Sequence, residues 1–175
     1  KTLFPYTTLF RSHLDLTGIY QTKNVLTVLE AVCALRMQGF KLSDAVVAEA
    51  LQQVKKITGL RGRWEVVHKH PTVVVDVAHN EDGIKQVVAQ LELMNYEHLH
   101  IVIGMVRDKA IEQVLSLLPK TATYYFTKAQ VPRALPEKEL AAMGANAGLH
   151  GHLFAEVNIA IKAALQHAQP KDVVL

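Results

Sequence analysis

The chain has 175 residues, of which half are hydrophobic and a fifth are charged, and this ordinary globular composition excludes an intrinsically disordered protein. The formal net charge is +3 at pH 7, without the basic stripe of a nucleic-acid-binding domain, and no apolar run is long enough to span a membrane. A single cysteine, Cys33, cannot form an internal disulfide. We therefore expect a cytoplasmic protein with no nucleic-acid or membrane partner.

The first residues stand apart from the rest. Residues 3–12 resemble the in-frame translation of a common sequencing-library adapter. We interpret residues 1–12 as a non-native scar and exclude them from the fold. The alternative is a native N-terminal arm that matches by accident. The scar interpretation also predicts that the natural protein continues upstream of His13.

Two helices are predicted between residues 13 and 58. Apolar residues recur at helical spacing from Val25 to Leu35, and Gly39 ends this pattern. Ser43 is placed to cap a second helix, which continues to the Lys55-Lys56 pair at its C-terminus. The glycine-containing stretch 58–62 is then the best candidate for a domain boundary.

Beyond residue 60 the pattern alternates between strands and helices. This alternation predicts an α/β fold with a mostly parallel, Rossmann-like sheet and helices on both faces. The predicted strands are residues 64–68, 72–76, 99–103, 123–126 and 152–154, and a further strand begins at residue 173. The predicted helices are residues 82–93, 111–118, 137–143 and 157–168.

Three polar side chains, Asp76, His79 and Asn80, follow the apolar run 73–75. Ligands of open α/β sheets bind beyond the carboxyl ends of the strands, where these residues would lie. Asp76 offers only acceptors, which suits the hydroxyls of a ribose, and the start of the following helix favours an anion. Arg63, one strand upstream, carries the planar fork of donors that matches phosphate oxygens. Together these residues suit a nucleotide or a carboxylate.

Each cluster also has a purely structural explanation. Arg63 fits a solvated loop residue, and His79 and Asn80 fit a local cap that binds backbone groups. Four further histidines alternate with apolar residues, as side chains on a strand face do: His98, His100, His150 and His152. Because no cysteine lies near these histidines in the sequence, we predict no zinc site.

Five short motifs follow one another in order along the chain: Gln21-x-x-Asn24, Gly62-Arg63-Trp64-Glu65, Asp76-Val-Ala-His79-Asn80, Gly104-Met105-x-x-Asp108-Lys109 and Arg133-Ala134-Leu135. Each motif is weak alone, but their order resembles the C-terminal part of the folylpolyglutamate synthase/dihydrofolate synthase family, in the Mur ligase superfamily. The resemblance covers residues 13–175. It implies that residues 13–58 are the closing helices of an ATPase domain and that residues 60–175 form the Mur ligase C-terminal α/β domain.

The resemblance also implies roles for four residues. Asn24 would contact the adenine of ATP, while Arg63 and Asp76 would bind the nucleotide, Asp76 at the ribose. His79 would lie near the incoming glutamate and the phosphate end, which makes it the candidate catalytic residue. The resemblance assigns no metal ligand within this chain.

The implied activity is an ATP-dependent amide ligation. In that family ATP phosphorylates the carboxylate of a folate or of dihydropteroate, and the amine of L-glutamate attacks the acyl phosphate to form an amide. The implied cofactors are ATP and Mg²⁺, whose ligands would lie upstream. The implied partners are these small molecules, and we expect a monomer.

The chain departs from the family pattern in three places. It contains no G-x-x-x-x-G-K-[ST] loop to cradle the phosphates. Ala110 replaces the second acid of the family's Asp-Lys-Asp, which leaves the role of Lys109 open. The family's Gly-Ser segment would follow Leu175. We therefore expect these residues alone to be inactive, and ATP turnover by them would contradict that expectation.

Of three alternative functions, one stays open, and two lack a motif that they need. A Mur ligase of cell-wall precursor synthesis uses the same nucleotide chemistry, although the Asp-Val-Ala-His-Asn sequence of residues 76–80 favours a folate ligase. A non-catalytic nucleotide-binding α/β module of the receiver type needs an acidic pair after its first strand, and residues 66–70 have none. A dinucleotide-dependent oxidoreductase needs G-x-G-x-x-G after a strand, and Gly144, Gly148 and Gly151 have the wrong spacing.

Overall fold

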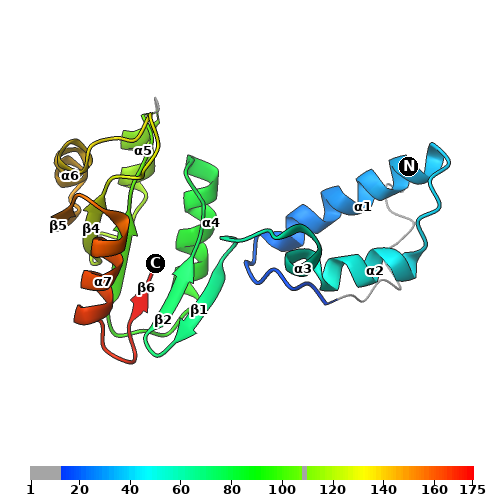
Figure 1. Ribbon diagram of the computed structural model, residues 1–175, viewed down its shortest axis with the longest axis horizontal. Coiled ribbons are helices and arrows are strands. Elements are labelled where there is room, and N and C mark those ends of the chain that lie inside the picture. The colour runs from blue at the N-terminus through cyan, green and yellow to red at the C-terminus, as the bar shows by residue number, and fades with distance from the viewer. Residues whose placement is uncertain (1–12, 108–109) are drawn as a thin grey trace. The chain divides into compact units, whose positions relative to one another are not determined.

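The described residues of the chain form two compact units. The computed structural model describes residues 13–107 and 110–175 (Figure 1). The first unit ends at Arg63, and the second runs from Trp64 to Leu175. The interpretation of residues 1–12 as a scar concerns a segment outside the described residues.

The first unit contains three helices, α1 (Gln21–Met37), α2 (Asp44–Gln52) and α3 (Val54–Thr58). The expected cap of α2 is confirmed, because the Oγ of Ser43 accepts the backbone N–H of Val46. The expected stop at Gly39 is also confirmed. Gly39 has a φ of +94°, and the backbone N–H of Phe40 returns to the carbonyl of Leu35 at 3.1 Å.

The sequence pattern predicts one continuous helix through residue 55, but the structure breaks it at Gln53. At the break, Asp15 binds the two backbone groups, of Leu51 and Lys55, that would bond to each other in a continuous helix. Its backbone N–H donates to the carbonyl of Leu51 at 3.4 Å, and its Oδ2 accepts the backbone N–H of Lys55 at 2.8 Å. In a continuous helix, Lys55 would donate to Leu51 directly. The break is therefore a tertiary effect that periodicity does not predict.

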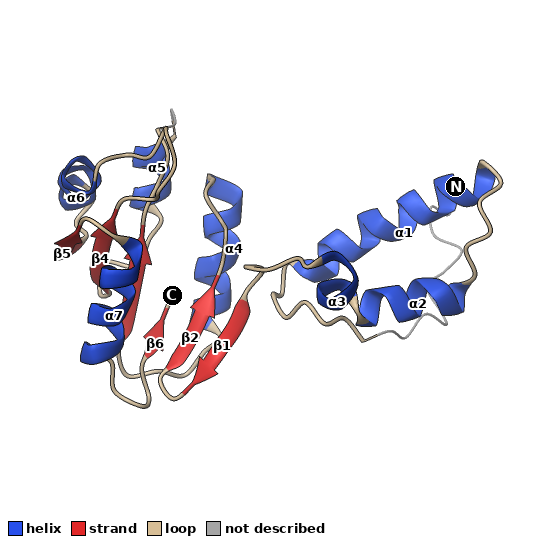
Figure 2. Ribbon diagram, in the orientation of Figure 1, coloured by secondary structure: helices blue, strands red, loops and turns tan. Residues whose placement is uncertain are grey.

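The second unit is built on a six-stranded sheet of order β1-β2-β6-β3-β4-β5 (Figure 2). Its strands are β1 (Glu65–Lys69), β2 (Thr72–Val75), β3 (Leu99–Ile103), β4 (Thr123–Thr127), β5 (His150–Phe154) and β6 (Val173–Val174). Only β1 is antiparallel to its neighbour, β2, because the two strands are joined by a tight turn of two residues. The other strand pairs are parallel, so the predicted mostly parallel sheet is confirmed.

Four helices cover the sheet: α4 (Glu81–Glu92), α5 (Ile111–Ser116), α6 (Glu137–Asn146) and α7 (Val157–His167). The chain moves outward from β2 through β3 and β4 to β5, and α7 then returns it to β6 in the middle. Since parallel crossovers are right-handed, α7 lies on the opposite face from the three outward crossovers. This arrangement confirms helices on both faces. None of the described helices is long and apolar enough to cross a lipid bilayer.

The core alternates between the two faces along β4. Tyr125 packs with Ala160 and Ala164 of α7, whereas Phe126 points to the other face, toward α6. Gly144 and Gly151 have packing roles. A Cβ on Gly144 would lie 2.8 Å from the Phe126 ring, and one on Gly151 would lie 1.8 Å from a backbone oxygen of β4. These close approaches explain both glycines without a dinucleotide.

Candidate functional site

The carboxylate of Asp76 joins the end of β2 to the start of β1. Its Oδ2 accepts the backbone N–H of Trp64 at 2.7 Å, and its Oδ1 accepts the backbone N–H of Ala78 at 2.8 Å. A carboxylate that accepts from two backbone N–H groups has both of its oxygens fixed in direction. The half-buried Asp76 is thus fixed in place at the end of β2.

Trp64 is a site residue that the sequence reasoning placed in a motif but gave no role. Its backbone has a φ of 50°, which is uncommon for a bulky side chain, and its indole is buried. This conformation directs the Trp64 N–H at Asp76. A tryptophan at the entry to a strand ordinarily indicates packing, so no sequence signal distinguished this contact.

His79 and Asn80 both bind backbone groups, as the structural explanation predicted. Asn80 caps α4, because its Oδ1 accepts the backbone N–H of Gly83 at 2.8 Å. The Nδ1 of His79 lies 3.0 Å from the carbonyl oxygen of Val77. A carbonyl oxygen only accepts, so Nδ1 carries the proton and Nε2 of the neutral ring keeps its lone pair. His79 is exposed, and its Nε2 is the atom available for chemistry.

The first turn of α4 also carries an ion pair. Lys85 donates to Glu81, and both side chains are about half exposed. The hydrogen bond and charge of Glu81 raise the pKa of Lys85 above its ordinary value. Lys85 is thereby engaged within α4.

The remaining predicted site residues, Asn24 and Arg63, belong to the first unit. The side-chain amide of Asn24 donates to the Oε1 of Gln21 at 2.9 Å, on the first turn of α1. Arg63 is half-buried and immediately precedes Trp64, whose N–H binds Asp76. The structure therefore brings Asp76, His79 and Asn80 together at the end of β2, and roles for Asn24 and Arg63 stay predictions.

A second loop pair lies at the carboxyl ends of β3 and β4. Val106 and Ala134 form an isolated antiparallel bridge, flanked by hydrogen bonds from Arg107 N–H to the Arg133 carbonyl and from Leu135 N–H to the Met105 carbonyl. Two of the sequence motifs are thus in direct contact. Asp108 and Lys109, which complete one of them, lie outside the described residues.

This loop pair is fixed by an exposed ion pair and carries free cations. Arg107 donates to both carboxylate oxygens of Glu139 on α6, at 2.9 and 2.7 Å. Lys128 and Arg133 are exposed, and neither side chain has a hydrogen-bond or ion-pair partner within the described part of the chain. Because the carboxyl ends of parallel strands share one edge, these cations lie at the same edge of the sheet as Asp76. The edge can therefore bind an anion.

Comparison with known proteins identifies the family. Residues 62–175 match the family described as Mur ligase, glutamate ligase domain. The chain belongs to this family. The match covers the second unit and begins at Gly62, next to the arginine and tryptophan that precede β1.

Among its relatives is a probable bifunctional folylpolyglutamate synthase/dihydropteroate synthase of Haloferax volcanii, which is 31% identical over 93% of this chain and 19% of its own length. A UDP-N-acetylmuramoyl-L-alanyl-D-glutamate–2,6-diaminopimelate ligase of Lactiplantibacillus plantarum is 28% identical over 93% of this chain and 33% of its own length. The Mur ligase chain therefore spans a third or less of these two relatives.

A solved structure of similar fold is the bifunctional folylpolyglutamate synthase/dihydrofolate synthase of Yersinia pestis, complexed with AMPPNP and a Mn ion. It aligns with a TM-score of 0.66 and 28% identity over 82% of this chain and 33% of that chain. The comparison confirms the fold of the Mur ligase domain.

The described residues of this Mur ligase chain suit a nucleotide better than a metal. Among them, no group of three or more His, Cys, Asp or Glu side chains is arranged to hold a metal ion. The edge of the sheet instead offers a fixed acceptor at Asp76, a free imidazole nitrogen at His79 and the cations Lys128 and Arg133. These groups match ribose hydroxyls and anionic oxygens.

Proposed function

We propose that the protein containing this chain is an ATP-dependent ligase that adds L-glutamate to a folate, either a tetrahydrofolate or dihydropteroate. The observation that carries this proposal is the Asp76 carboxylate, held by two backbone N–H groups at the carboxyl edge of a Mur ligase glutamate-ligase domain. Acceptors held in this way are preorganised for a hydroxyl pair. The Haloferax volcanii relative, named as a folylpolyglutamate synthase, favours folate as the acceptor.

In this proposal Asp76 binds the ribose, Arg63 binds phosphate oxygens and Asn24 contacts the adenine. The half-buried position of Arg63 suits a donor that is partly removed from water. The fixed position of the Asp76 carboxylate, which accepts the backbone N–H groups of Trp64 and Ala78, supports the ribose assignment. ATP supplies the phosphoryl group, and Mg²⁺ would be held by residues other than these.

The proposed reaction consists of a phosphoryl transfer followed by an acyl transfer. A carboxylate oxygen of the folate attacks the γ-phosphorus of ATP, the bond to the ADP oxygen breaks, and an acyl phosphate forms. The glutamate nitrogen then attacks the acyl carbon, phosphate leaves, and the nitrogen loses a proton as the amide forms. In this proposal His79 accepts that proton through Nε2, and the contact of Nδ1 with the Val77 carbonyl supports the assignment because it leaves the Nε2 lone pair available in the neutral ring.

The first unit has a thin core, which supports its proposed origin in an ATPase domain. Within its described residues only three large apolar side chains are buried, and each keeps 7–9% of its surface exposed: Leu16, Val47 and Leu51. Large apolar side chains on α1 and α2 are exposed, among them Leu26, Val28 and Val46. Exposed apolar helix faces ordinarily pack against further structure. We propose that residues 13–58 complete a larger ATPase domain and that residues 60–175 form the Mur ligase domain.

The test uses the whole protein in an assay for ATP-dependent incorporation of glutamate into folate. Arg63→Ala should lower kcat/KM by at least about tenfold, because a charge-assisted hydrogen bond to phosphate is lost. The matched control is Lys69→Ala, which removes an exposed cation at the other end of β1 and should leave kcat/KM unchanged. Equal rates for Arg63→Ala and the wild type would reject the phosphate role.

A second candidate is a ligase of cell-wall precursor synthesis. The similarity to the Lactiplantibacillus plantarum ligase over 93% of this chain favours it. The same assay separates the two, with a folate and a UDP-N-acetylmuramoyl peptide as alternative acceptors. Turnover with the peptide alone would replace the folate proposal. Failure of the whole protein to turn over ATP with either acceptor would favour a non-catalytic nucleotide-binding module.

A further inference from the structure

In the part of the sheet that the structure describes, two halves are joined in strand pairing by β6 alone. The strand order places β1 and β2 on one side of β6 and β3, β4 and β5 on the other. Within the described residues, β2 and β3 do not pair with each other, and β6 has two residues that pair with both. The spacing between the loop after β2 and the loop after β3 therefore depends on this short strand.

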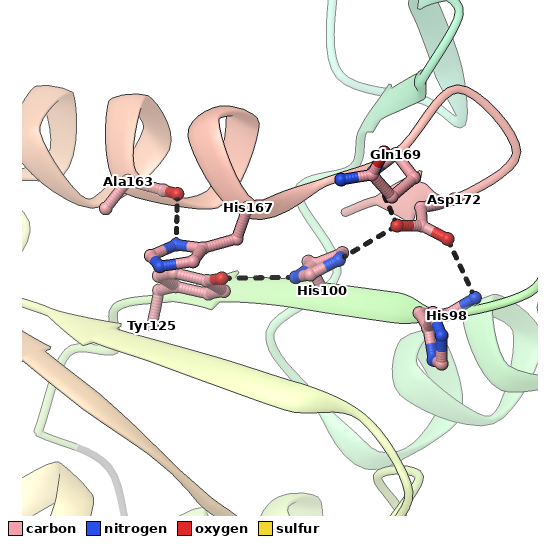
Figure 3. Close-up of polar contacts among 7 residues, drawn as sticks. All are labelled: His98, His100, Tyr125, Ala163, His167, Gln169 and Asp172. Atoms are coloured by element: carbon pink, nitrogen blue, oxygen red, sulfur yellow. Dashed lines mark hydrogen bonds and ion pairs between the residues drawn. The ribbon is translucent and has the colours of Figure 1, made fainter.

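Asp172, directly before β6, is bonded to the segments on both sides. Its backbone carbonyl accepts the N–H of Thr72, the first residue of β2, at 3.0 Å. Its Oδ1 accepts the N–H of His98, next to β3, at 3.0 Å, and its Oδ2 accepts the N–H of Gln169 at 2.7 Å (Figure 3). One residue thus links β2, β3 and the turn after α7.

A histidine and a tyrosine extend this contact into the core. The Nε2 of His100 lies 3.4 Å from Asp172 Oδ2, and its Nδ1 lies 3.1 Å from the hydroxyl of Tyr125 (Figure 3). Since an ionised carboxylate only accepts, Nε2 carries the proton, and Tyr125 donates to Nδ1 of the neutral ring. All three side chains are buried, with Asp172 exposed by only 1%. A buried carboxylate is costly unless it is fully hydrogen-bonded, which makes its partners specific.

We propose that Asp172 is a positioning residue, which with His100 fixes β6 between β2 and β3 and so sets the spacing between the two halves of the candidate site. The apolar cluster of Tyr125, Ala160, Ala164 and Val174, against which Val73 of β2 packs, also joins the halves, but apolar contact is non-directional. The hydrogen bonds of Asp172 are directional and therefore determine the register. The link to the site depends on the function proposed above, whereas the link between the halves does not.

The test measures amide hydrogen exchange by NMR in the 175-residue chain. The bridging amides are those of Thr72, Val102, Val173 and Leu175, which hydrogen-bond across β2–β6 and β3–β6. In Asp172→Asn, one acceptor oxygen becomes an NH₂ group facing donors. The bridging amides should then exchange at least about tenfold faster relative to amides of the β4–β5 ladder.

His100→Phe is the second variant, for the case in which Asp172→Asn fails to fold. It keeps a ring of similar shape but removes the donor to Asp172, and it should show the same selective increase. The matched control is Lys171→Ala, which breaks an exposed ion pair to Glu97 between the same two segments and should change exchange by less than about twofold. A uniform increase at all amides, or no increase at the bridging amides, would overturn the proposal.

A second measurement tests the link to the site. In the whole protein, His100→Phe should lower kcat/KM for ATP by about tenfold or more, and Lys171→Ala should leave it unchanged. Unchanged kcat/KM in His100→Phe would overturn the link to the site. If the unmodified whole protein shows no ATP turnover, the proposed function fails, and the exchange experiment still decides the role of Asp172.

Discussion

The Oδ2 of Asp76 accepts the backbone N–H of Trp64 at 2.7 Å, so the candidate ribose ligand is also a structural part of the β1–β2 hairpin. The contact spans 12 positions in sequence and holds Trp64 at a positive φ. Any substitution of Asp76 will therefore change stability as well as binding, and the two effects need separate measurements.

Asp76→Asn should lower the free energy of unfolding by roughly 1.5–3 kcal/mol, because a hydrogen bond to a charged acceptor is lost and an NH₂ group then faces a backbone N–H. Urea unfolding followed by tryptophan fluorescence measures it, since Trp64 is the only tryptophan. The control is Asp82→Asn on the exposed first turn of α4, which should cost less than about 1 kcal/mol. Equal stability of Asp76→Asn and the wild type would contradict the structural role.

The cap formed by Asn80 gives a second prediction. Asn80→Ala should lower the free energy of unfolding by about 1 kcal/mol, since the backbone N–H of Gly83 loses its acceptor. Asn80→Asp keeps an acceptor oxygen and should differ from the wild type by only a few tenths of a kcal/mol. Chemical denaturation of the three proteins provides the comparison, and a costly Asn80→Asp would indicate a role for the amide beyond capping.

Thr127, at the end of β4, has a buried hydroxyl without a hydrogen-bond partner among the described residues. Thr127→Val replaces this hydroxyl with a methyl group of similar shape. The substitution should stabilise the fold by about 1 kcal/mol, because an unsatisfied polar atom is removed. Thr72→Val, which removes a hydroxyl bonded to the carbonyl of Lys69, should give no such gain. A lower melting temperature for Thr127→Val would show that the hydroxyl is bound in solution.

The buried carboxyl of Asp172 should make the free energy of unfolding depend on pH in the acid range. Burial alone would raise its pKa, but hydrogen bonds from the Gln169 backbone, the His100 side chain and the His98 backbone outweigh burial and lower the pKa below its ordinary value. The ionised group therefore stabilises the fold above the unfolded-state pKa of about 3.9, and this contribution is lost as pH falls through the lower folded-state pKa.

Urea unfolding at a series of pH values below about 5 measures this contribution. The wild type should lose stability more steeply than Asp172→Asn, which has no carboxyl to protonate at this position. If Asp172→Asn does not fold, His100→Phe should show a shallower loss than the wild type, because one of the bonds that lower the pKa is gone. Parallel curves for the variant and the wild type would refute the prediction.

Most elements of the second unit follow from the sequence, because apolar periodicity and turn residues are local signals. The strand 99–103 has the predicted bounds, and the residues after β2 are together at the strand end as expected. The contacts that were missed join distant positions. Asp172 and His98 lie 74 residues apart, and Asp15 and Lys55 lie 40 apart. A single sequence carries no signal for such pairs, nor for the contact of Trp64, at its positive φ, with Asp76.

The contact of Asp15 with the α2–α3 break has a practical consequence for expression design. A truncated version that starts after residue 15 would lack the carboxylate that intercepts the Lys55 amide. Residues 44–58 would then form one continuous helix, in which Gln53 is helical. A version that begins at Gln21, the first residue of α1, would thus differ in helix content from the full chain, and circular dichroism would register the difference as a gain in helix per residue.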